Sequence, residues 1–233
     1  MRIDVIIDTI CPWCFIGKRR LDSLIADRPY VNFEVIWHPF LLNPEIPSEG
    51  LDYKEHINNL GGKTRFENIN NAINQTAENL NIKFNFSQIK RTPNTLDSHR
   101  IIKFASHQNL STEILEAIYQ NYFLKGADIG DRSILIKIGK EVGLDSTNLR
   151  DYLCSDKDVS EILAKNRQIC QLGISGIPTF IFGQNFSISG IQNTKILQRM
   201  LTIADSNLDN IDLQNGESIT PSSIQLSDNH EQK

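Results

Sequence analysis

Two cysteines separated by two residues constrain this chain more than any other feature of its sequence. Cys11 and Cys14 follow the apolar run at residues 5–7 and stand directly before a segment with helical apolar spacing. The pattern predicts a strand that delivers the sequence Cys-Pro-Trp-Cys to the first turn of a helix. Pro12 suits the first helical position, because its fixed φ fits there and its missing N–H is not needed.

Two thiols at that place predict redox chemistry. The unpaired N–H groups at a helix N-terminus and the positive end of the helix dipole favour a thiolate, and disulfide exchange proceeds by thiolate attack. We therefore expect Cys11 to be the exposed nucleophile. Cys14 lies almost one turn further on, along the inner side of the helix. It would attack a mixed disulfide formed at Cys11 and so act as the resolving thiol.

Half of a zinc site and a pair of core cysteines are the alternatives for the same motif. A structural zinc site needs four ligands, usually with a second close pair among them. The other cysteines, Cys154 and Cys170, lie far apart, and neither has a histidine at ligand spacing. We expect Cys170 in the core, on an apolar helical stripe, and Cys154 at a helix end. No metal site is predicted.

Composition and charge fit a globular enzyme. The chain has 233 residues and 39% hydrophobic content, which suffices for one domain with a sizeable core or for two closely packed ones. The formal net charge is −4 and no basic cluster occurs, so binding to nucleic acid or to a membrane surface is not supported.

The N-terminal residues indicate in which cellular compartment we expect the protein. Asp4 and Asp8 interrupt any apolar core that a signal peptide would need, and no apolar run reaches the length of a membrane span. We therefore expect a cytoplasmic protein. Thiols are kept reduced in the cytosol, which favours a catalytic over a structural cysteine pair.

Periodicity divides the rest of the chain into elements. Residues 2–8 and 33–37 are predicted strands joined by a helix, which gives a βαβ unit. The middle of the chain is helical. Asp131 is expected to cap one helix that Gly143 closes, and Asp156 is expected to open another.

A breaker-rich loop at residues 173–178 precedes a predicted hairpin. The loop ends in Ile-Pro and is followed by two short runs of β-forming residues, separated by a Gly-Gln-Asn turn at 183–185. A last helix is expected around residues 197–204. From Asp205 the chain is polar and poor in aromatic residues, and we expect this tail to be disordered.

A Cys-x-x-Cys unit near the N-terminus and a Gly-Ile-Pro-Thr-Phe hairpin near the C-terminus together resemble the thioredoxin superfamily. The resemblance implies that the Ile177–Pro178 bond is cis and that Pro178 lies against the disulfide. It also implies that Ile177 offers its backbone groups to an extended substrate, so that both residues bind substrate.

The fold class that follows is α/β, a thioredoxin-like fold with a large all-helical insertion. Residues 1–45 and 156–204 would form the two parts of the thioredoxin-like domain. Residues 46–155 would form the insertion, and residues 205–233 the polar tail.

Three stretches resemble the DsbA family, in particular its cytosolic FrnE-like branch. They are Cys-Pro-Trp-Cys-Phe-Ile-Gly-Lys at 11–18, Asn-Thr-Leu-Asp-Ser-His-Arg at 94–100 and Ser-Gly-Ile-Pro-Thr-Phe at 175–180. The resemblance implies a dithiol–disulfide oxidoreductase that acts on proteins with thiols or disulfides. Cys11 and Cys14 would form its redox-active disulfide without a further cofactor, and glutathione is a candidate reductant or ligand.

Other residues near the pair have two interpretations each. Pro12 and Trp13 are expected beside bound substrate, although Trp13 also fits an ordinary exposed aromatic residue. His99 borders the apolar stripe of its helix; it either lines the cleft over Cys11 or is a satisfied side chain without a role. Asp8 is either a buried acid near the thiols or a residue at the end of a strand that faces solvent.

A second function class shares this fold family. Kappa-class glutathione transferases and 2-hydroxychromene-2-carboxylate isomerases bind glutathione against the cis-proline and use a serine in place of the nucleophilic cysteine. This chain keeps both cysteines, and Gln192 is neutral where those relatives have an acidic residue for the glutathione amine. Both departures weaken that alternative. A noncatalytic peptide-binding module would leave the dithiol unexplained, and the sequence sets neither the redox direction nor the oligomeric state.

Overall fold

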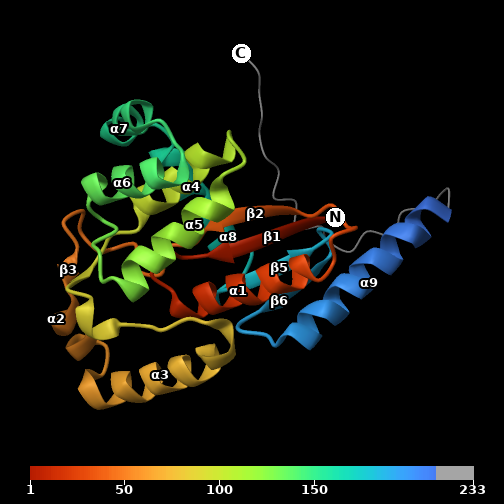
Figure 1. Ribbon diagram of the computed structural model, residues 1–233, viewed down its shortest axis with the longest axis horizontal. Helices are drawn as coiled ribbons and strands as arrows, with labels where there is room; N and C mark the ends of the chain where they lie inside the picture. Colours follow the sequence, from red (N-terminus) through yellow and green to blue (C-terminus); the bar gives the residue numbers. More distant parts are fainter. Residues whose placement is uncertain (214–233) are drawn as a thin grey trace.

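A four-stranded sheet lies at the centre of the molecule (Figure 1). The computed structural model describes residues 1–213, with the backbone alone for residues 206–213. The strand order is β2-β1-β5-β6, in which β1 and β2 are parallel and the other neighbours antiparallel. The strands are β1 (Arg2–Ile7), β2 (Glu34–Pro39), β5 (Thr179–Phe182) and β6 (Phe186–Ser189). Helix α1 (Pro12–Ala26) connects the parallel pair, which confirms the predicted βαβ unit.

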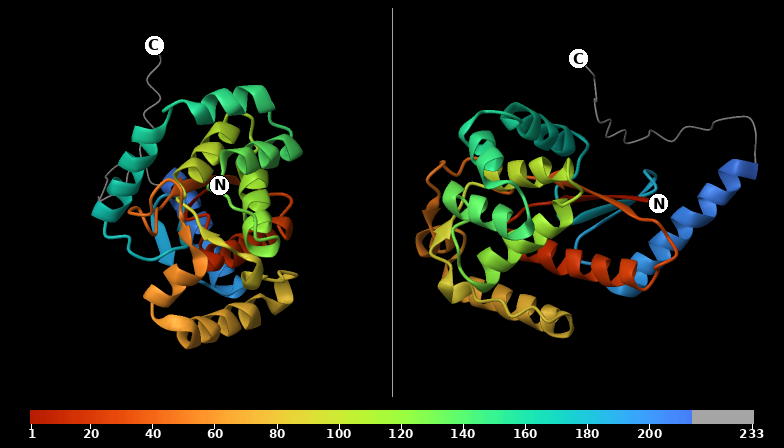
Figure 2. Two further views of the ribbon diagram at one scale, coloured as in Figure 1. Left: turned by 90° about the vertical axis from the view of Figure 1, so that its left-hand side faces the viewer. Right: turned by 45° about the horizontal axis from the view of Figure 1, so that its top comes forward.

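Alternating side chains of β1 divide the core into two layers. Ile3, Val5 and Ile7 pack in a large apolar cluster with α1 and α9 (Thr194–Leu213), on one face of the sheet. Ile6 packs on the opposite face against Ile169 of α8 (Val159–Gln171). The views in Figure 2 show α1 and α9 along one side of the sheet and α8 on the other. Because both faces of β1 are covered, its sequence is apolar without strict alternation.

Between β2 and α8 the chain forms a helical insertion (Figures 1 and 2). Its helices are α2 (Tyr53–Asn59), α3 (Gly62–Ala77), α4 (Leu96–Ser106), α5 (Ser111–Tyr119), α6 (Arg132–Val142) and α7 (Ser146–Cys154). Short 3-10 turns lie at Glu78–Leu80 and Phe86–Gln88, a π-helical turn at Gln120–Leu124, and a two-stranded ribbon at β3 (Leu51–Asp52) and β4 (Arg91–Thr92). Residues of the insertion belong to the same apolar cluster as α1 and β1, so the insertion and the sheet share a core. The α/β fold with a helical insertion confirms the expected fold class.

Two helix starts show what capping residues can predict. Asp131 caps α6 as expected, because its carboxylate accepts the Ser133 N–H at 2.7 Å, and Gly143 ends that helix with a φ of 109°. The prediction for Asp156 is wrong. Helix α8 has Asp158 as its N-cap residue, because a turn from Asp156 to Val159 precedes the first helical residue.

The two remote cysteines are both exposed. Cys154 is the last residue of α7, as expected for a helix end. The expectation that Cys170 lies in the core is wrong. The buried side of α8 runs through Ile162, Asn166 and Ile169, because a helix of 3.6 residues per turn brings position 169 rather than 170 to that side.

The C-terminal part of α9 extends away from the rest of the molecule (Figure 2). It continues to Leu213, past residue 205, where the disordered tail was expected to begin. The rest of that expected tail, residues 214–233, lies outside the described residues. Among residues 1–213, no helix is both long enough and apolar enough to cross a membrane.

Candidate active site

The N-terminus of α1 carries the cysteine pair. Cys11 is the N-cap residue, with extended backbone angles (φ −92°, ψ 109°), and its side chain makes no capping hydrogen bond. Its carbonyl accepts the N–H groups of Cys14 (3.0 Å) and Phe15 (3.2 Å), and Pro12 is the first helical residue. The Cys11 thiol therefore lies at the positive end of the helix without a role in capping.

Both cysteines are free thiols, and both are buried. Cys14 is 0% exposed and Cys11 is 4% exposed, so the expectation of an exposed Cys11 is wrong. A helix N-terminus is open to solvent only where nothing packs over it. Here the apolar cluster that contains both cysteines also contains residues of the insertion, and Trp13 and Ile177 pack against it half-buried. Cys11 is still the more exposed of the two residues.

The Cys14 thiol has no solvent around it to stabilise a charge. Burial raises the pKa of this thiol well above its usual value, and the neighbouring Cys11 raises it further. A hydrogen bond with the backbone of Asp8 acts in the opposite direction. At neutral pH Cys14 is therefore protonated, and it has to lose its proton before it can attack a disulfide.

The loop before β5 brings Pro178 against the same helix. The Ile177–Pro178 bond is cis, which confirms the conformation that the family resemblance implies. A Cβ placed on Gly17 would lie 3.0 Å from Pro178 Cγ and 3.0 Å from Phe180 Cζ, so the proline ring packs on α1 about one turn beyond Cys14. Within the described part of the chain, the backbone N–H and carbonyl of Ile177 have no hydrogen-bond partner.

Asp8 is fully buried and bonded on several sides. Its carboxylate accepts the Leu42 N–H at 2.8 Å and lies 3.2 Å from His99 Nε2 and 3.5 Å from the Thr9 hydroxyl. Its carbonyl accepts the Cys11 N–H at 3.2 Å. Asp8 is therefore a buried acid next to the cysteine motif and not a residue at the end of a strand that faces solvent.

The structure brings His99 to the cysteine motif through Asp8. Helix α4 holds His99 in its first turn, where the backbone N–H donates to the Thr95 carbonyl at 3.1 Å. The ring is buried, and its bond to Asp8 joins residues 91 positions apart in sequence. Next to it, the hydroxyls of Ser98 and Thr9 bond at 2.6 Å, which ties α4 to the end of β1 a second time.

Tyr119 is a site residue that the sequence analysis missed. Its hydroxyl donates to the Asp8 carbonyl at 3.2 Å, and its ring stacks on Phe15 with 5.0 Å between centroids. Burial raises the pKa of this hydroxyl well above its usual value, and the charges of Cys14, Cys11 and Asp8 add to the rise. Tyr119 therefore stays a hydrogen-bond donor. The available signal in the sequence was its spacing of four residues from Leu115, which places both residues on the same side of a helix.

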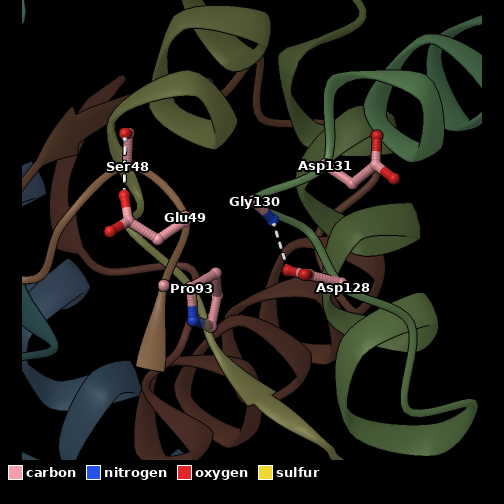
Figure 3. A pocket seen from close by; sticks show the side chains of 7 residues that line it. Ser48, Glu49, Pro93, Asp128, Gly130 and Asp131 are labelled. Carbon is pink, nitrogen blue, oxygen red and sulfur yellow. Dashed lines mark hydrogen bonds between the residues drawn. The ribbon is translucent and has the colours of Figure 1, made fainter. Parts of the chain in front are cut away.

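A surface pocket of about 200 Å³ lies between the loops at residues 48–50, 93 and 128–131 (Figure 3). Neither Cys11 nor Cys14 lines it. Its acidic side chains bond to neighbouring groups of the chain: Asp128 accepts the Gly130 N–H at 2.9 Å, Asp131 caps α6, and Glu49 accepts the Ser48 hydroxyl at 3.2 Å. Over the described residues, no three His, Cys, Asp or Glu side chains gather as a group that could hold a metal ion.

These features define a class of protein. A βαβ unit with two cysteines at the N-terminus of its helix, joined to an antiparallel hairpin with a cis-proline at its entrance, is the thioredoxin fold. A family model described as the DSBA-like thioredoxin domain matches residues 2–202, and the chain belongs to that family.

The chain is similar to a relative and to a solved structure over most of its length. An uncharacterized protein of Bacillus subtilis (strain 168), YwbO, is 29% identical over 204 residues, which cover 87% of this chain and 96% of that protein. The crystal structure of a probable DsbA oxidoreductase from Streptomyces coelicolor has a TM-score of 0.80 at 22% identity, over 95% of this chain and 94% of that one.

Two further structures share the fold at 15% identity, each over 92% of this chain and 100% of the other. One is the cytosolic disulfide reductase DsbM from Pseudomonas aeruginosa with GSH, at a TM-score of 0.62. The other is a 2-hydroxychromene-2-carboxylate isomerase, at a TM-score of 0.66. At such identities the likeness concerns the fold alone.

Proposed function

We propose that this chain is a thiol–disulfide oxidoreductase that exchanges disulfides with protein or small thiol substrates through Cys11 and Cys14. The observation that carries the proposal is a pair of free thiols at the N-terminus of α1, with Pro178 packed on the same helix. Membership of the DsbA-like family supports it, because oxidoreductases are typical of that family.

The proposed reaction has two steps. The Cys11 thiolate attacks a substrate disulfide, which forms a mixed disulfide and releases one substrate thiol. Cys14 then attacks the Cys11 sulfur, which forms the Cys11–Cys14 disulfide and releases the second thiol. Two electrons pass from the cysteine pair to the substrate, and the reverse sequence oxidises a dithiol. Bound substrate lies beside Pro12 and Trp13 in this proposal and pairs with the free backbone groups of Ile177.

The proposal extends to partners and location. Its redox group is the Cys11–Cys14 disulfide, without another cofactor, and glutathione is a candidate for the thiol that reduces it. The proposed location is the cytoplasm, which is also the location in the printed name of one protein of the same fold, a cytosolic disulfide reductase. We propose neither a nucleic-acid nor a membrane partner.

The test is the reduction of a model protein disulfide, such as those of insulin, by a small thiol with and without the full chain. We expect the chain to accelerate reduction and Cys11→Ser to abolish the acceleration. Cys14→Ser should accumulate mixed disulfides, which mass spectrometry detects. Cys154→Ser, at an exposed cysteine outside the site, is the matched control and should behave as the unmodified chain. Full activity of Cys11→Ser would refute the proposal.

The transferase or isomerase alternative is less well supported by the site. The Gln192 carbonyl accepts a 2.6 Å hydrogen bond from the Arg20 guanidinium, which puts a cation where an amine of glutathione would need an anion. We therefore expect at most weak conjugation of glutathione to chlorodinitrobenzene. Strong conjugation that survives Cys14→Ser would favour this alternative over disulfide exchange.

A further inference from the structure

Strand β6 forms one edge of the central sheet, on the side away from β2 (Figure 1). Edge strands of natural proteins are usually protected by a charged residue, a proline, a bulge or a covering element. The other edge strand, β2, has Glu34 and Pro39 at its ends, and α5 and α8 pack against it. Strand β6 has no charge and no proline, and its register with β5 is regular, without a bulge.

The register with β5 determines which backbone groups of β6 point outward. The Gly190 N–H donates to the Pro178 carbonyl at 2.7 Å, so every second residue before Gly190 is hydrogen-bonded to β5. The backbone groups of Ser187 and Ser189 therefore point away from the sheet. The Ser189 carbonyl accepts the Gln192 side-chain amide at 2.9 Å. The remaining groups of the two serines have no backbone partner among the described residues.

The side chains of β6 also leave room for a neighbouring strand. Phe186 and Ile188 pack against the large apolar cluster on the side of α1 and α9, but both are only half-buried. Ser187 and Ser189 are exposed, and strand alternation places them on the other face of the sheet. A strand added to this edge would cover the exposed parts of two apolar side chains and meet only small hydroxyl groups on the other face.

We propose that β6 pairs with β6 of a second copy of this chain, antiparallel about a two-fold axis at Ser187. Ser187 exchanges two backbone hydrogen bonds with Ser187 of the second copy, and each Ser189 N–H donates to the Asn185 carbonyl of the other copy. Phe186 then lies opposite Ile188 of the second copy, at the closer spacing of a non-hydrogen-bonded pair. A register centred on Ile188 would need the Ser189 carbonyl, which Gln192 already occupies.

The distribution of charge favours a second copy over another partner. In a two-fold pairing, a charge near the axis meets its own image, and like charges directly opposite each other are destabilising. Charged residues make up 22% of the chain, yet none occurs between Arg167 and Lys195. The edge strand lies within this uncharged stretch, so that two copies can approach without repulsion between like charges.

The first test measures the mass of the full chain in solution by light scattering, over a range of concentrations. We expect about twice the 26.5 kDa of one chain. Ser187→Lys and Ser187→Asp should each be monomeric, because like charges then meet at the axis. An equal mixture of the two variants should form a dimer with one copy of each, which native mass spectrometry identifies. Only a residue that faces its own image gives this result.

Ser187→Pro tests the backbone pairing. The Ser187 N–H points outward, so proline removes this donor without breaking the ladder between β5 and β6. The dimer loses two hydrogen bonds, and we expect its dissociation constant to rise about tenfold or more. Ser160→Lys, at an exposed serine of α8, is the control and should leave the dimer unchanged. Far-UV circular dichroism identifies a variant that does not fold, in which case the remaining variants at Ser187 decide.

Three results would overturn the proposal. One is an unmodified chain that stays monomeric at every concentration. Another is a dimer that persists in Ser187→Lys alone and in Ser187→Asp alone, because the contact then lies elsewhere. The third is a monomer in which Ser187→Pro slows the reduction of insulin but not that of a small disulfide, since the edge then holds an extended substrate. The mass measurements do not depend on Cys11 and Cys14, so the proposed function is tested separately.

Discussion

Arg100 is a charged residue with a structural role, within the stretch at 94–100 that resembles the DsbA family. Its guanidinium is fully buried and stacks over the Tyr152 ring. It donates to the Asp97 carboxylate (2.6 Å) and to the carbonyls of Tyr152 (2.8 Å), Leu153 (3.3 Å), Ser155 (2.6 Å) and Lys157 (2.9 Å). These carbonyls lie at the end of α7 and in the turn to α8. One side chain therefore fixes the join between two helices, next in sequence to His99.

We expect Arg100→Met to lower the free energy of unfolding by about 3–5 kcal/mol, because buried carbonyls lose their donors and Asp97 loses a cation. Urea denaturation followed by circular dichroism measures the loss. Arg132 also donates to Asp97, at 2.7 Å, but its side chain is 51% exposed. Arg132→Met should therefore cost at most about 1 kcal/mol. Equal losses in the two variants would contradict the role given to Arg100.

Asp4 makes stability depend on pH. Burial raises the pKa of its carboxyl, but hydrogen bonds from His38 and Arg2 outweigh this effect and hold the pKa below its usual value. A lowered pKa in the folded state stabilises the fold above the unfolded-state value of about 3.9, and the contribution disappears as the pH falls through the folded-state value. We expect Asp4→Asn to be less stable than the unmodified chain near neutral pH. The difference in stability between the two chains should shrink below about pH 4. Urea midpoints of the two chains that are as far apart at acidic as at neutral pH would contradict this.

Without a family resemblance, local patterns in the sequence identify a site residue only where its partners are close in the chain. Cys11 and Cys14 act within one helical turn, so their spacing alone identifies them. The bond from His99 to Asp8 spans 91 residues and that from Tyr119 spans 111 residues. No local pattern encodes such a contact. The burial of Cys11 was missed for the same reason, because residues distant in sequence produce it.

At the scale of elements, Gly17 decides how α1 and the Pro178 loop pack. A glycine inside a helix usually costs about 0.5–1 kcal/mol relative to alanine, so helix propensity alone predicts that Gly17→Ala stabilises the chain. The added Cβ would however lie 3.0 Å from the Pro178 ring and 3.0 Å from Phe180, which is fully buried. We expect the cost of overpacking to exceed the gain in helix propensity. The free energy of unfolding, measured by urea denaturation, should fall by about 1–2 kcal/mol.

Gly176→Ala is the control for this prediction. A Cβ there meets nothing within 4 Å, although the residue lies in the same loop. Its free energy of unfolding should change by no more than about 0.5 kcal/mol. A more stable Gly17→Ala variant would mean that the loop moves away from α1 without loss. The packing of Pro178 on α1 would then not be tight.

The boundaries of a helix can be predicted from the sequence where a capping residue precedes the helix and a glycine follows it. Helix α6 has Asp131 before it and Gly143 after it, and both predictions are confirmed. Helix α8 has two aspartates near its start; the sequence pattern favours Asp156, whereas Asp158 precedes the helix. Asp158 has a left-handed φ of 65°, and its carboxylate accepts the Tyr152 hydroxyl at 2.7 Å. Tertiary contacts therefore set this start, and local capping preference could not reveal it.

At the scale of the whole molecule, the insertion and the sheet are joined by polar contacts as well as by their shared core. The Trp37 indole N–H of β2 donates to the Thr112 hydroxyl of α5 at 2.9 Å. The Lys18 ammonium of α1, 2% exposed, lies 2.9 Å from Glu116 of α5 and 2.7 Å from Asp22. Both contacts join α5 to the thioredoxin-like part of the chain. We therefore expect the two parts to unfold together.

The last prediction tests this coupling through Glu116. Burial raises the pKa of its carboxyl, but the Lys18 charge and the hydrogen bonds from Lys18 and Gln120 together outweigh this effect, so the pKa is lowered. Glu116→Gln leaves the buried Lys18 ammonium with Asp22 as its remaining carboxylate. A buried pair that loses one partner costs about 3–5 kcal/mol, and Glu116 is 21% exposed, so we expect a loss of about 1–3 kcal/mol. Glu67→Gln breaks the exposed pair with Lys63 and should cost about 0.5 kcal/mol or less.

Tryptophan fluorescence reports on Trp13 and Trp37, and far-UV circular dichroism on the helices of the insertion. Because the lost contact belongs to both parts, the two signals should shift together to a lower urea midpoint and stay coincident; a helical signal that is lost first, in a separate transition, would contradict the shared core.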